Sequence, residues 1–215
     1  MAVEYVVARD GTELAERLYR FRYQIYGGEL GIALDHYPAG QMRDRLDAAA
    51  RNYVAVRDGE VIGSLRTCDL ADLPEHAQFG RNYNLPFILA FFAPNEVTYV
   101  SRMAVGAEAR HTPVMVRLQQ YAVQEARARG VRLAFTDCSP KHLPLYGPIG
   151  YTPYGPPFED PVFGLKVPIL TVGGDLKLLQ ERRSPLLKAC APYGDDAEAR
   201  HWFERQVQAR RALPA

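Results

Sequence analysis

The sequence has few cysteines, and they form no recognisable pattern. Cys68, Cys138 and Cys190 are an odd number at unrelated spacings, which argues against a disulfide framework and against a cysteine-based zinc site. The five histidines show no metal-ligand spacing either, so we expect no metal centre. Reduced thiols of this kind fit a protein of the cytoplasm.

The chain also lacks an excess of charge and a long apolar run. Its 26 Lys and Arg residues balance 25 Asp and Glu residues, so no strong field is present to attract nucleic acid or an anionic membrane. The longest apolar stretch, residues 85–94, contains two prolines and is far shorter than the roughly 20 residues that cross a bilayer. The first ten residues do not resemble a signal peptide. The composition, 47% hydrophobic, predicts one globular cytoplasmic domain over residues 1–215.

Periodicity predicts alternating strands and helices in the first half of the chain. A strand is expected at 4–8, and a helix that Thr12 caps and that ends near Gly27 and Gly28. Strands at 51–57 and 60–70 flank Asp58-Gly59, a strong signal for a hairpin turn. Residues 71–94 have no clean periodicity, apart from a pattern compatible with a short helix at 85–92.

The second half predicts a parallel pair of strands. A strand at 97–105, a helix at 113–129 that Gly130 ends, and a strand at 131–137 form a strand–helix–strand unit. A short helical piece at 141–149, a proline-rich loop at 153–161 and a strand at 165–172 follow. Helices are expected at 176–190 and, with Asp195 as cap, at 195–211, so that residues 176–215 form a C-terminal helical extension. The expected fold is therefore α/β (α+β), with a mixed and mostly antiparallel central sheet and flanking helices.

Four segments occur in the order seen in a known group of enzymes. They are LYRFRYQIYGGELG at 18–31 with Arg22, DRLDAAARNYVAVRDGEVIGSLR at 44–66 with Asp44, Asp47 and Arg66, VSRMAV at 100–105 with Ser101 and Arg102, and SPKHLPLYGPIGY at 139–151 with His142 and Tyr146. Together they resemble GNAT-fold acyltransferases, in particular autoinducer (acyl-homoserine-lactone) synthases and N-acyl amino acid synthases. The resemblance implies a GNAT-like sheet with splayed central strands. It also implies an N-acyltransferase that moves an acyl group from a thioester to an amine in the biosynthesis of a signal or secondary metabolite.

Two departures from the family pattern bear on the substrates. Tyr99 stands where the family has a glutamate, so we expect an acceptor amine that is not of the homoserine-lactone type. The glycine-rich loop that wraps the diphosphate of coenzyme A in GNAT enzymes is replaced by residues 110–115, RHTPVM. A loop without glycine approaches a diphosphate less closely, whereas the single phosphate of a carrier-bound phosphopantetheine arm demands less of it. The expected donor is therefore an acyl carrier protein, with coenzyme A as the alternative and no permanently bound cofactor. The residues expected at the donor are Val105, Arg110, Thr112 and Val114.

Amide formation from a thioester needs a neutral amine, donors for the developing oxyanion and an acid for the departing thiolate. Tyr146 is the candidate acid, because a phenol with a pKa of about 10 can protonate a thiolate whose parent thiol has a pKa of about 8.5 or higher; a packed aromatic ring is the alternative role. His142 is a candidate general base, Ser101 a further catalytic candidate, and the backbone at Met103 a candidate for polarising the carbonyl. A covalent mechanism at Cys138 is also open, although a cysteine in a strand is more often a buried apolar residue.

The remaining candidates are charged or polar. The residues expected to line the acceptor pocket are Arg22, Asp44, Asp47, Arg66, Tyr99, Arg102 and Met103. For the arginines and aspartates, a purely structural ion-pair network is an equal alternative. Arginines at 110, 117, 127, 129 and 132 are candidates for docking an acidic carrier protein. Two rival functions remain open, an ordinary acyl-coenzyme A N-acetyltransferase and a catalytically silent GNAT-like binding module.

Overall fold

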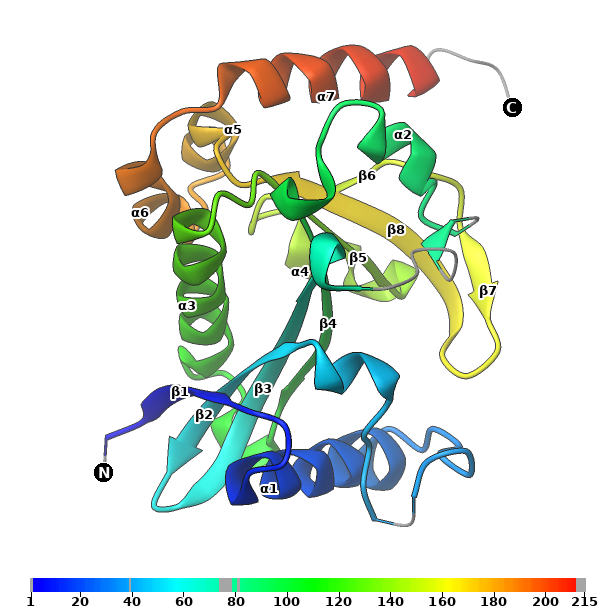
Figure 1. The fold of residues 1–215 in the computed structure, drawn as a ribbon, viewed down its shortest axis with the longest axis vertical. Coiled ribbons are helices and arrows are strands. Elements are labelled where there is room, and N and C mark those ends of the chain that lie inside the picture. The colour runs from blue at the N-terminus through cyan, green and yellow to red at the C-terminus, as the bar shows by residue number, and fades with distance from the viewer. Residues whose placement is uncertain (1, 39, 74–78, 81, 212–215) are drawn as a thin grey trace. The chain divides into compact units, whose positions relative to one another are not determined.

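The computed structural model describes residues 2–38, 40–73, 79–80 and 82–211 (Figure 1). They fall into two compact units. Unit 1 comprises Met1–Cys68, Val100–Ala122 and Pro161–Phe163, and unit 2 comprises Asp69–Tyr99, Val123–Asp160 and Gly164–Ala215. The chain passes between the units several times, and strand β4 (Val97–Val105) contributes residues to both.

Unit 1 contains an antiparallel sheet. Strand β2 (Arg51–Arg57) pairs with β1 (Glu4–Ala8) on one side and with β3 (Glu60–Asp69) on the other, and β3 neighbours β4. The β2–β3 hairpin turns at Asp58 and Gly59, whose φ angles of 54° and 83° are those that a tight two-residue turn requires. The predicted hairpin is therefore confirmed.

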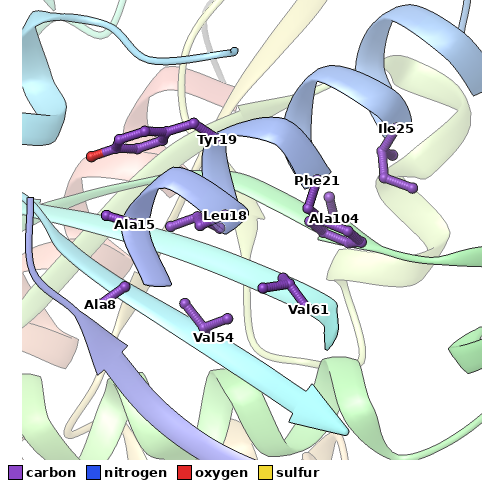
Figure 2. Packing of buried hydrophobic residues seen from close by; sticks show 9 residues of the cluster. All are labelled: Ala8, Ala15, Leu18, Tyr19, Phe21, Ile25, Val54, Val61 and Ala104. Carbon is purple, nitrogen blue, oxygen red and sulfur yellow. The ribbon is translucent and has the colours of Figure 1, made fainter. Parts of the chain in front are cut away.

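Helix α1 (Glu13–Tyr23) covers one face of this sheet. Thr12 caps it as predicted, with its Oγ1 accepting from the Ala15 amide at 3.3 Å. Its apolar side packs on small and β-branched residues of the strands (Figure 2); the cluster consists of Ala8, Ala15, Leu18, Tyr19, Phe21, Ile25, Val54, Val61 and Ala104. A π-helical segment, Gln24–Glu29, follows α1 and contains the two glycines predicted at its end. A second cluster joins the strands to residues 114–122 of helix α3 (Val114–Ala128), among them Leu118 and Ala122.

Unit 2 is built on three longer strands and two short ones. The first residues of β4, Val97–Tyr99, pair in parallel with β5 (Leu133–Cys138), as the strand–helix–strand unit predicts. Strand β8 (Gly164–Val172) runs antiparallel to β5 and also pairs with β6 (Thr152–Pro153) and β7 (Phe158–Asp160). The β4–β5 register ends at Tyr99 and Phe135 although both strands continue, which is the splay expected of a GNAT-like sheet. The expected fold class is confirmed.

Helices α2 (Leu85–Leu89), α4 (Leu143–Tyr146), α5 (Leu176–Glu181), α6 (Leu187–Cys190) and α7 (Ala197–Arg211) complete unit 2. The rings of Phe87, Phe91 and Phe92 lie 4.9–5.4 Å from that of Trp202 on α7. These phenylalanines thus form a core with α7. Among the described residues, every helix is too short or too polar to span a membrane.

Three local predictions are wrong. The helix expected at 176–190 is two helices, because Arg183 is left-handed (φ 51°), the Ser184 hydroxyl accepts from the Leu186 amide, and Pro185 has no amide hydrogen to continue the helix. The proline-rich stretch contains a strand, β7, whose three residues are too few to show a periodicity. The cap of α7 is Asp196, which accepts from the Ala199 amide at 3.1 Å, whereas Asp195 pairs with Arg200.

Candidate functional site

A buried cluster of arginines and aspartates lies in unit 1. Arg66 of β3 reaches Asp44 at 2.7 Å and Asp47 at 3.0 Å, Arg22 of α1 reaches Asp47 at 2.8 Å, and Arg102 of β4 reaches Asp44 at 2.7 Å. The structure therefore brings together the five charged residues that the sequence motifs single out, from segments up to 80 positions apart along the chain.

Local structure holds the two aspartates in place. Asp44 precedes a 3-10 turn, Arg45–Ala48, and its Oδ1 accepts from the Leu46 amide at 2.9 Å. Asp47 reaches back to the Asp44 amide, also at 2.9 Å, so the pair forms a capping box. Backbone amides therefore hold both carboxylates in addition to the arginines.

Three polar neighbours complete the cluster. Ser101 Oγ accepts from Arg66 Nε at 3.0 Å, and Asn52 Oδ1 accepts from Arg22 Nη2 at 2.6 Å. The sequence motifs did not identify Asn52, nor Tyr37, which contacts Arg102. Asn52 could have been identified as a polar residue at a buried strand position, paired in register with Arg66. Tyr37 lies in a loop, where the sequence carries no comparable signal.

The cluster is charged and mostly buried. Arg22 and Asp47 have side chains with no exposed surface, and that of Arg66 is 2% exposed. Burial alone would raise the pKa of the Asp44 carboxyl, but the charges and hydrogen bonds of Arg66 and Arg102 outweigh it and hold this pKa well below its usual range. Burial would likewise lower the pKa of Arg66, but Asp44 and Asp47 raise it above the ordinary value. At neutral pH the three guanidinium groups thus face two carboxylates, an excess of one positive charge.

Arg102 differs from the other two arginines. It occupies the left-handed region (φ 54°) in the middle of β4, a strained conformation for a long side chain. Its Nη2 donates to the Tyr37 hydroxyl at 2.6 Å, and its Cζ lies 5.8 Å and 5.4 Å from the ring centres of Tyr37 and Phe163. Its Nε is buried with no hydrogen-bond partner among the described residues. With a side chain 12% exposed, Arg102 is the arginine of the cluster most accessible to a solute.

The four residues expected at the donor form the connection from β4 to α3 in unit 1. Arg110 donates from Nε to the Val105 carbonyl at 3.2 Å and pairs with Glu29. The Thr112 hydroxyl donates to the Ala109 carbonyl at 2.5 Å and accepts from the Val114 amide at 3.4 Å. The start of α3 is therefore largely satisfied by its own loop. Met103, also of unit 1, accepts from Tyr26 through its carbonyl and from Gln119 through its sulfur.

Two of the predicted catalytic residues lie in unit 2, whereas Ser101 lies in unit 1. Tyr146 ends α4, is half-buried, and meets the ring of Tyr151 edge-on at 5.5 Å. Partial burial, together with the charges of Lys141 and Lys166, lowers the pKa of His142, so its imidazole is neutral at pH 7. Burial and the neighbouring Asp137 raise the pKa of the Cys138 thiol to about 11, which disfavours a covalent mechanism at neutral pH.

Most of the arginines considered for docking have acidic or carbonyl partners. Arg129 pairs with Asp69 at 3.0 Å, Arg132 pairs with Glu96, Asp196 and Glu198, and Arg127 donates to the Val131 carbonyl. Much of this positive charge is therefore neutralised within unit 2. The described residues contain no group of three or more His, Cys, Asp or Glu side chains that could hold a metal ion.

The sequence of the chain matches the family model of the N-acyl amino acid synthase FeeM over residues 17–172. The chain belongs to this family. It is accordingly an N-acyltransferase, as the sequence motifs imply.

Solved structures show the same fold at low sequence identity. FeeM, an N-acyl amino acid synthase from uncultured soil microbes, is 15% identical, with a TM-score of 0.61 over 87% of this chain and 96% of FeeM. TofI, in a ternary complex with an inhibitor and MTA, is 21% identical, with a TM-score of 0.60 over 82% of this chain and 96% of TofI. BjaI, a CoA-dependent acyl-homoserine lactone synthase in complex with SAM and isopentyl-CoA, is 15% identical, with a TM-score of 0.64 over 89% of this chain and 97% of BjaI. No curated protein sequence matches the chain.

Proposed function

We propose that this N-acyltransferase moves an acyl group from a phosphopantetheine thioester to the amine of an amino acid, in the biosynthesis of a signal or secondary metabolite. The observation that carries the proposal is the excess positive charge of the buried cluster in unit 1. A buried charge requires a partner, and the carboxylate of an amino acid would balance the third guanidinium group.

Arg102 is the proposed carboxylate ligand. Its Nε is a buried donor without a partner among the described residues, and its guanidinium lies near the rings of Tyr37 and Phe163, which reduce competition from water. Arg22 binds Asp47, and Arg66 binds both aspartates, each from a buried position, so these two arginines fix the cluster rather than contact the substrate. Asp44 restrains Arg102 from the other side at 2.7 Å.

A carrier protein is the proposed source of the thioester. Among the first backbone groups of α3, Pro113 has no amide hydrogen, and the Val114 amide is directed to Thr112 Oγ1 at 3.4 Å. This leaves few donors for a diphosphate, which favours the single phosphate of a carrier-bound arm. Coenzyme A is the second candidate donor, because the structurally similar BjaI is CoA-dependent.

The proposed chemistry joins the amine nitrogen to the thioester carbonyl and breaks the carbon–sulfur bond. Tyr146, as a phenol, would give a proton to the departing thiolate. Ser101 acts in this proposal through Arg66, whose Nε donates to its hydroxyl, and so positions the cluster rather than reacting. His142 is neutral at pH 7 and exposed, and it is proposed to hold water rather than to bind substrate.

The test compares donors and acceptors with the full chain. The protein is incubated with acyl carrier protein or coenzyme A carrying acyl groups of several lengths, and with each amino acid, S-adenosylmethionine, or the amine obtained by removing the amino acid's carboxylate. Mass spectrometry detects the amide. We expect product from an amino acid and at least tenfold less from its decarboxylated amine. Equal use of both amines, or no product from any pair, would contradict the proposal.

The substitution Arg102→Gln tests the carboxylate ligand. We expect it to raise KM for the amino acid by about 10- to 100-fold, because it removes one or two charge-assisted hydrogen bonds to the carboxylate. KM for the donor should stay within about twofold of the wild-type value. Arg43→Gln is the control, because Arg43 forms an exposed ion pair with Asp10 in the same unit. If Arg102→Gln raises KM for the decarboxylated amine as much as KM for the amino acid, Arg102 does not bind the carboxylate.

A further inference from the structure

Unit 2 contains a pocket that the proposed function does not use. Its volume is about 390 Å³, within the range of about 300–1,000 Å³ that is usual for small-molecule sites. The lining is mostly apolar, which suits a ligand with an apolar body. It consists of six residues, all of unit 2, namely Gly147, Pro148, Tyr151, Thr152, Pro153 and Arg182.

Three elements position these residues. Gly147 and Pro148 directly follow helix α4, Thr152 and Pro153 are strand β6, which pairs with β8, and Arg182 directly follows helix α5. Each wall of the pocket is therefore continuous with a regular element of unit 2. A pocket whose walls are already in place loses little free energy to ordering when a ligand binds.

Arg182 connects the walls. Its Nη1 donates to the carbonyl oxygens of Gly147 and Tyr151, both at 2.9 Å, and its Nη2 donates to Thr152 Oγ1 at 3.1 Å. These three acceptors are neutral, so they hold the guanidinium group in place without cancelling its positive charge. The pocket therefore has a fixed cationic group in its wall.

Tyr151 contributes a hydroxyl group that no described residue engages. The residue is 9% exposed, and its ring meets that of Tyr146 edge-on at 5.5 Å. Burial raises the pKa of its phenol, so the hydroxyl is protonated at neutral pH and can donate. This hydroxyl is not one of the described polar atoms that are sealed from solvent and lack a partner, so it retains contact with solvent. The pocket, whose wall Tyr151 helps to form, provides that contact.

The two polar groups of the pocket favour a carboxylate. A positive charge and a hydroxyl donor both favour an anion over a cation. Two such groups can engage the two oxygens of a carboxylate. A phosphate has more oxygens and more charge, and it would lose more hydration than these groups replace when it entered a mostly apolar pocket.

We propose that this pocket binds an organic carboxylate with an apolar body, of the class of medium-chain fatty acids and N-acyl amino acids. The Tyr151 hydroxyl donates to a carboxylate oxygen, the charge of Arg182 attracts the carboxylate, and the apolar body lies against Pro148 and Pro153. The site goes beyond the proposed function, because binding here requires no acyl transfer. Since Gly147 directly follows Tyr146, the bound carboxylate contacts the segment that carries the proposed acid.

Isothermal titration calorimetry of the full chain with octanoate tests the site. We expect octanoate to bind at least tenfold more tightly than octylamine, which has the same chain and the opposite charge, and than inorganic phosphate, which has no apolar body. N-octanoylglycine distinguishes the two sources of the carboxylate. Tighter binding than that of octanoate supports N-acyl amino acids, and equal or weaker binding supports free fatty acids. No binding of either carboxylate, or equal binding of octylamine, would overturn the proposal.

Substitutions in the pocket show whether the carboxylate binds there. Tyr151→Phe keeps the ring and removes only the hydroxyl, and we expect it to raise Kd for octanoate about tenfold. Arg182→Gln should raise Kd at least as much. Arg183→Gln is the matched control, because it removes an equal charge from the neighbouring, exposed residue, and it should stay within about twofold of wild type. Tyr151→Phe keeps every hydrogen bond of Arg182, so it tests the site even if Arg182→Gln folds poorly.

Arg102→Gln separates this pocket from the proposed acceptor site in unit 1. We expect it to leave Kd for octanoate unchanged. A Kd that rises in Arg102→Gln and not in Tyr151→Phe would assign the carboxylate to the cluster of unit 1 and would overturn the inference, while the proposed function stands. Absence of acyl transfer by the wild-type protein would overturn the proposed function and leave the binding result unaffected.

Discussion

The charge on Asp44 couples the buried cluster of unit 1 to pH. Its side chain is 23% exposed, and the charges of Arg66 and Arg102 outweigh burial and depress the pKa of its carboxyl. A carboxyl whose pKa is lower in the folded than in the unfolded chain stabilises the fold fully above the unfolded value of about 3.9. That stabilisation is lost as the pH falls from about 4 through the lower pKa of the folded state.

Asp44→Asn should remove this pH dependence. Asparagine keeps an oxygen for the Leu46 amide, so the cap persists while the charge is lost. Urea unfolding between pH 7 and pH 2 should show that the wild-type free energy of unfolding declines below pH 4 more steeply than that of the variant, by up to about 1.4 kcal/mol per pH unit. Asp35→Asn, which changes an exposed carboxyl, should follow the wild-type curve. Parallel curves for wild type and Asp44→Asn would contradict the pKa assignment.

The packing of β3 against α3 leaves no room for a side chain at position 63. A Cβ on Gly63 would lie 2.8 Å from Val114 Cγ1 and 3.0 Å from Leu118 Cδ1. Overpacking of this kind costs about 1–3 kcal/mol. Gly63→Ala should therefore lower the free energy of unfolding by that amount, as measured by urea titration.

Gly28→Ala, in the π-helical segment Gln24–Glu29, is the control for this substitution. Its added Cβ would have no neighbour within 4 Å, and its φ angle lies outside the left-handed region. We expect its stability to stay within about 0.5 kcal/mol of wild type or to rise slightly. If both alanine variants unfold at the same urea concentration, the close approach of α3 to β3 is not as tight as the structure shows.

Elements whose signals lie within a few residues were predictable from the sequence. The Thr12 cap, the Asp58-Gly59 turn and the bounds of β4 depend on neighbouring residues, and all were predicted correctly. The break after α5 and the pairing of β7 depend on tertiary contacts, such as the bond from the Ser184 hydroxyl to the Ile149 carbonyl 35 residues away. These were missed because periodicity carries no information about distant partners.

The same distinction applies to the site. Motif resemblance singled out Arg22, Arg66 and Asp44 because their identities and spacing follow a family pattern. Tyr37 was missed, since it lies in a loop and contacts Arg102 65 positions away. The structure was needed to show that one partner of Arg102 is a phenol.

At the scale of the whole molecule, the chain interleaves the two units. Unit 1 takes residues from three separate stretches, and β4 runs from one unit into the other without a break. Because unit 1 is built from distant stretches of the chain, its folding also restricts the stretches between them, which belong to unit 2. We therefore expect the two units to unfold in one cooperative transition rather than in two.

A substitution in unit 1, followed by a probe in unit 2, tests this cooperativity. Asp47→Asn leaves Arg22 buried without its carboxylate partner, which costs about 3–5 kcal/mol when one member of a buried pair is removed. Trp202, the single tryptophan, packs on Phe91 in unit 2, so its fluorescence reports on that unit alone. In urea, the fluorescence midpoint should fall together with the far-ultraviolet circular dichroism midpoint. The exposed-pair variant Arg43→Gln should leave both midpoints close to those of the wild-type protein. The contrary result is an unchanged fluorescence midpoint together with a circular dichroism curve that has two steps. Unit 2 would then keep its structure after unit 1 had unfolded, and the shared strand β4 would not couple the units.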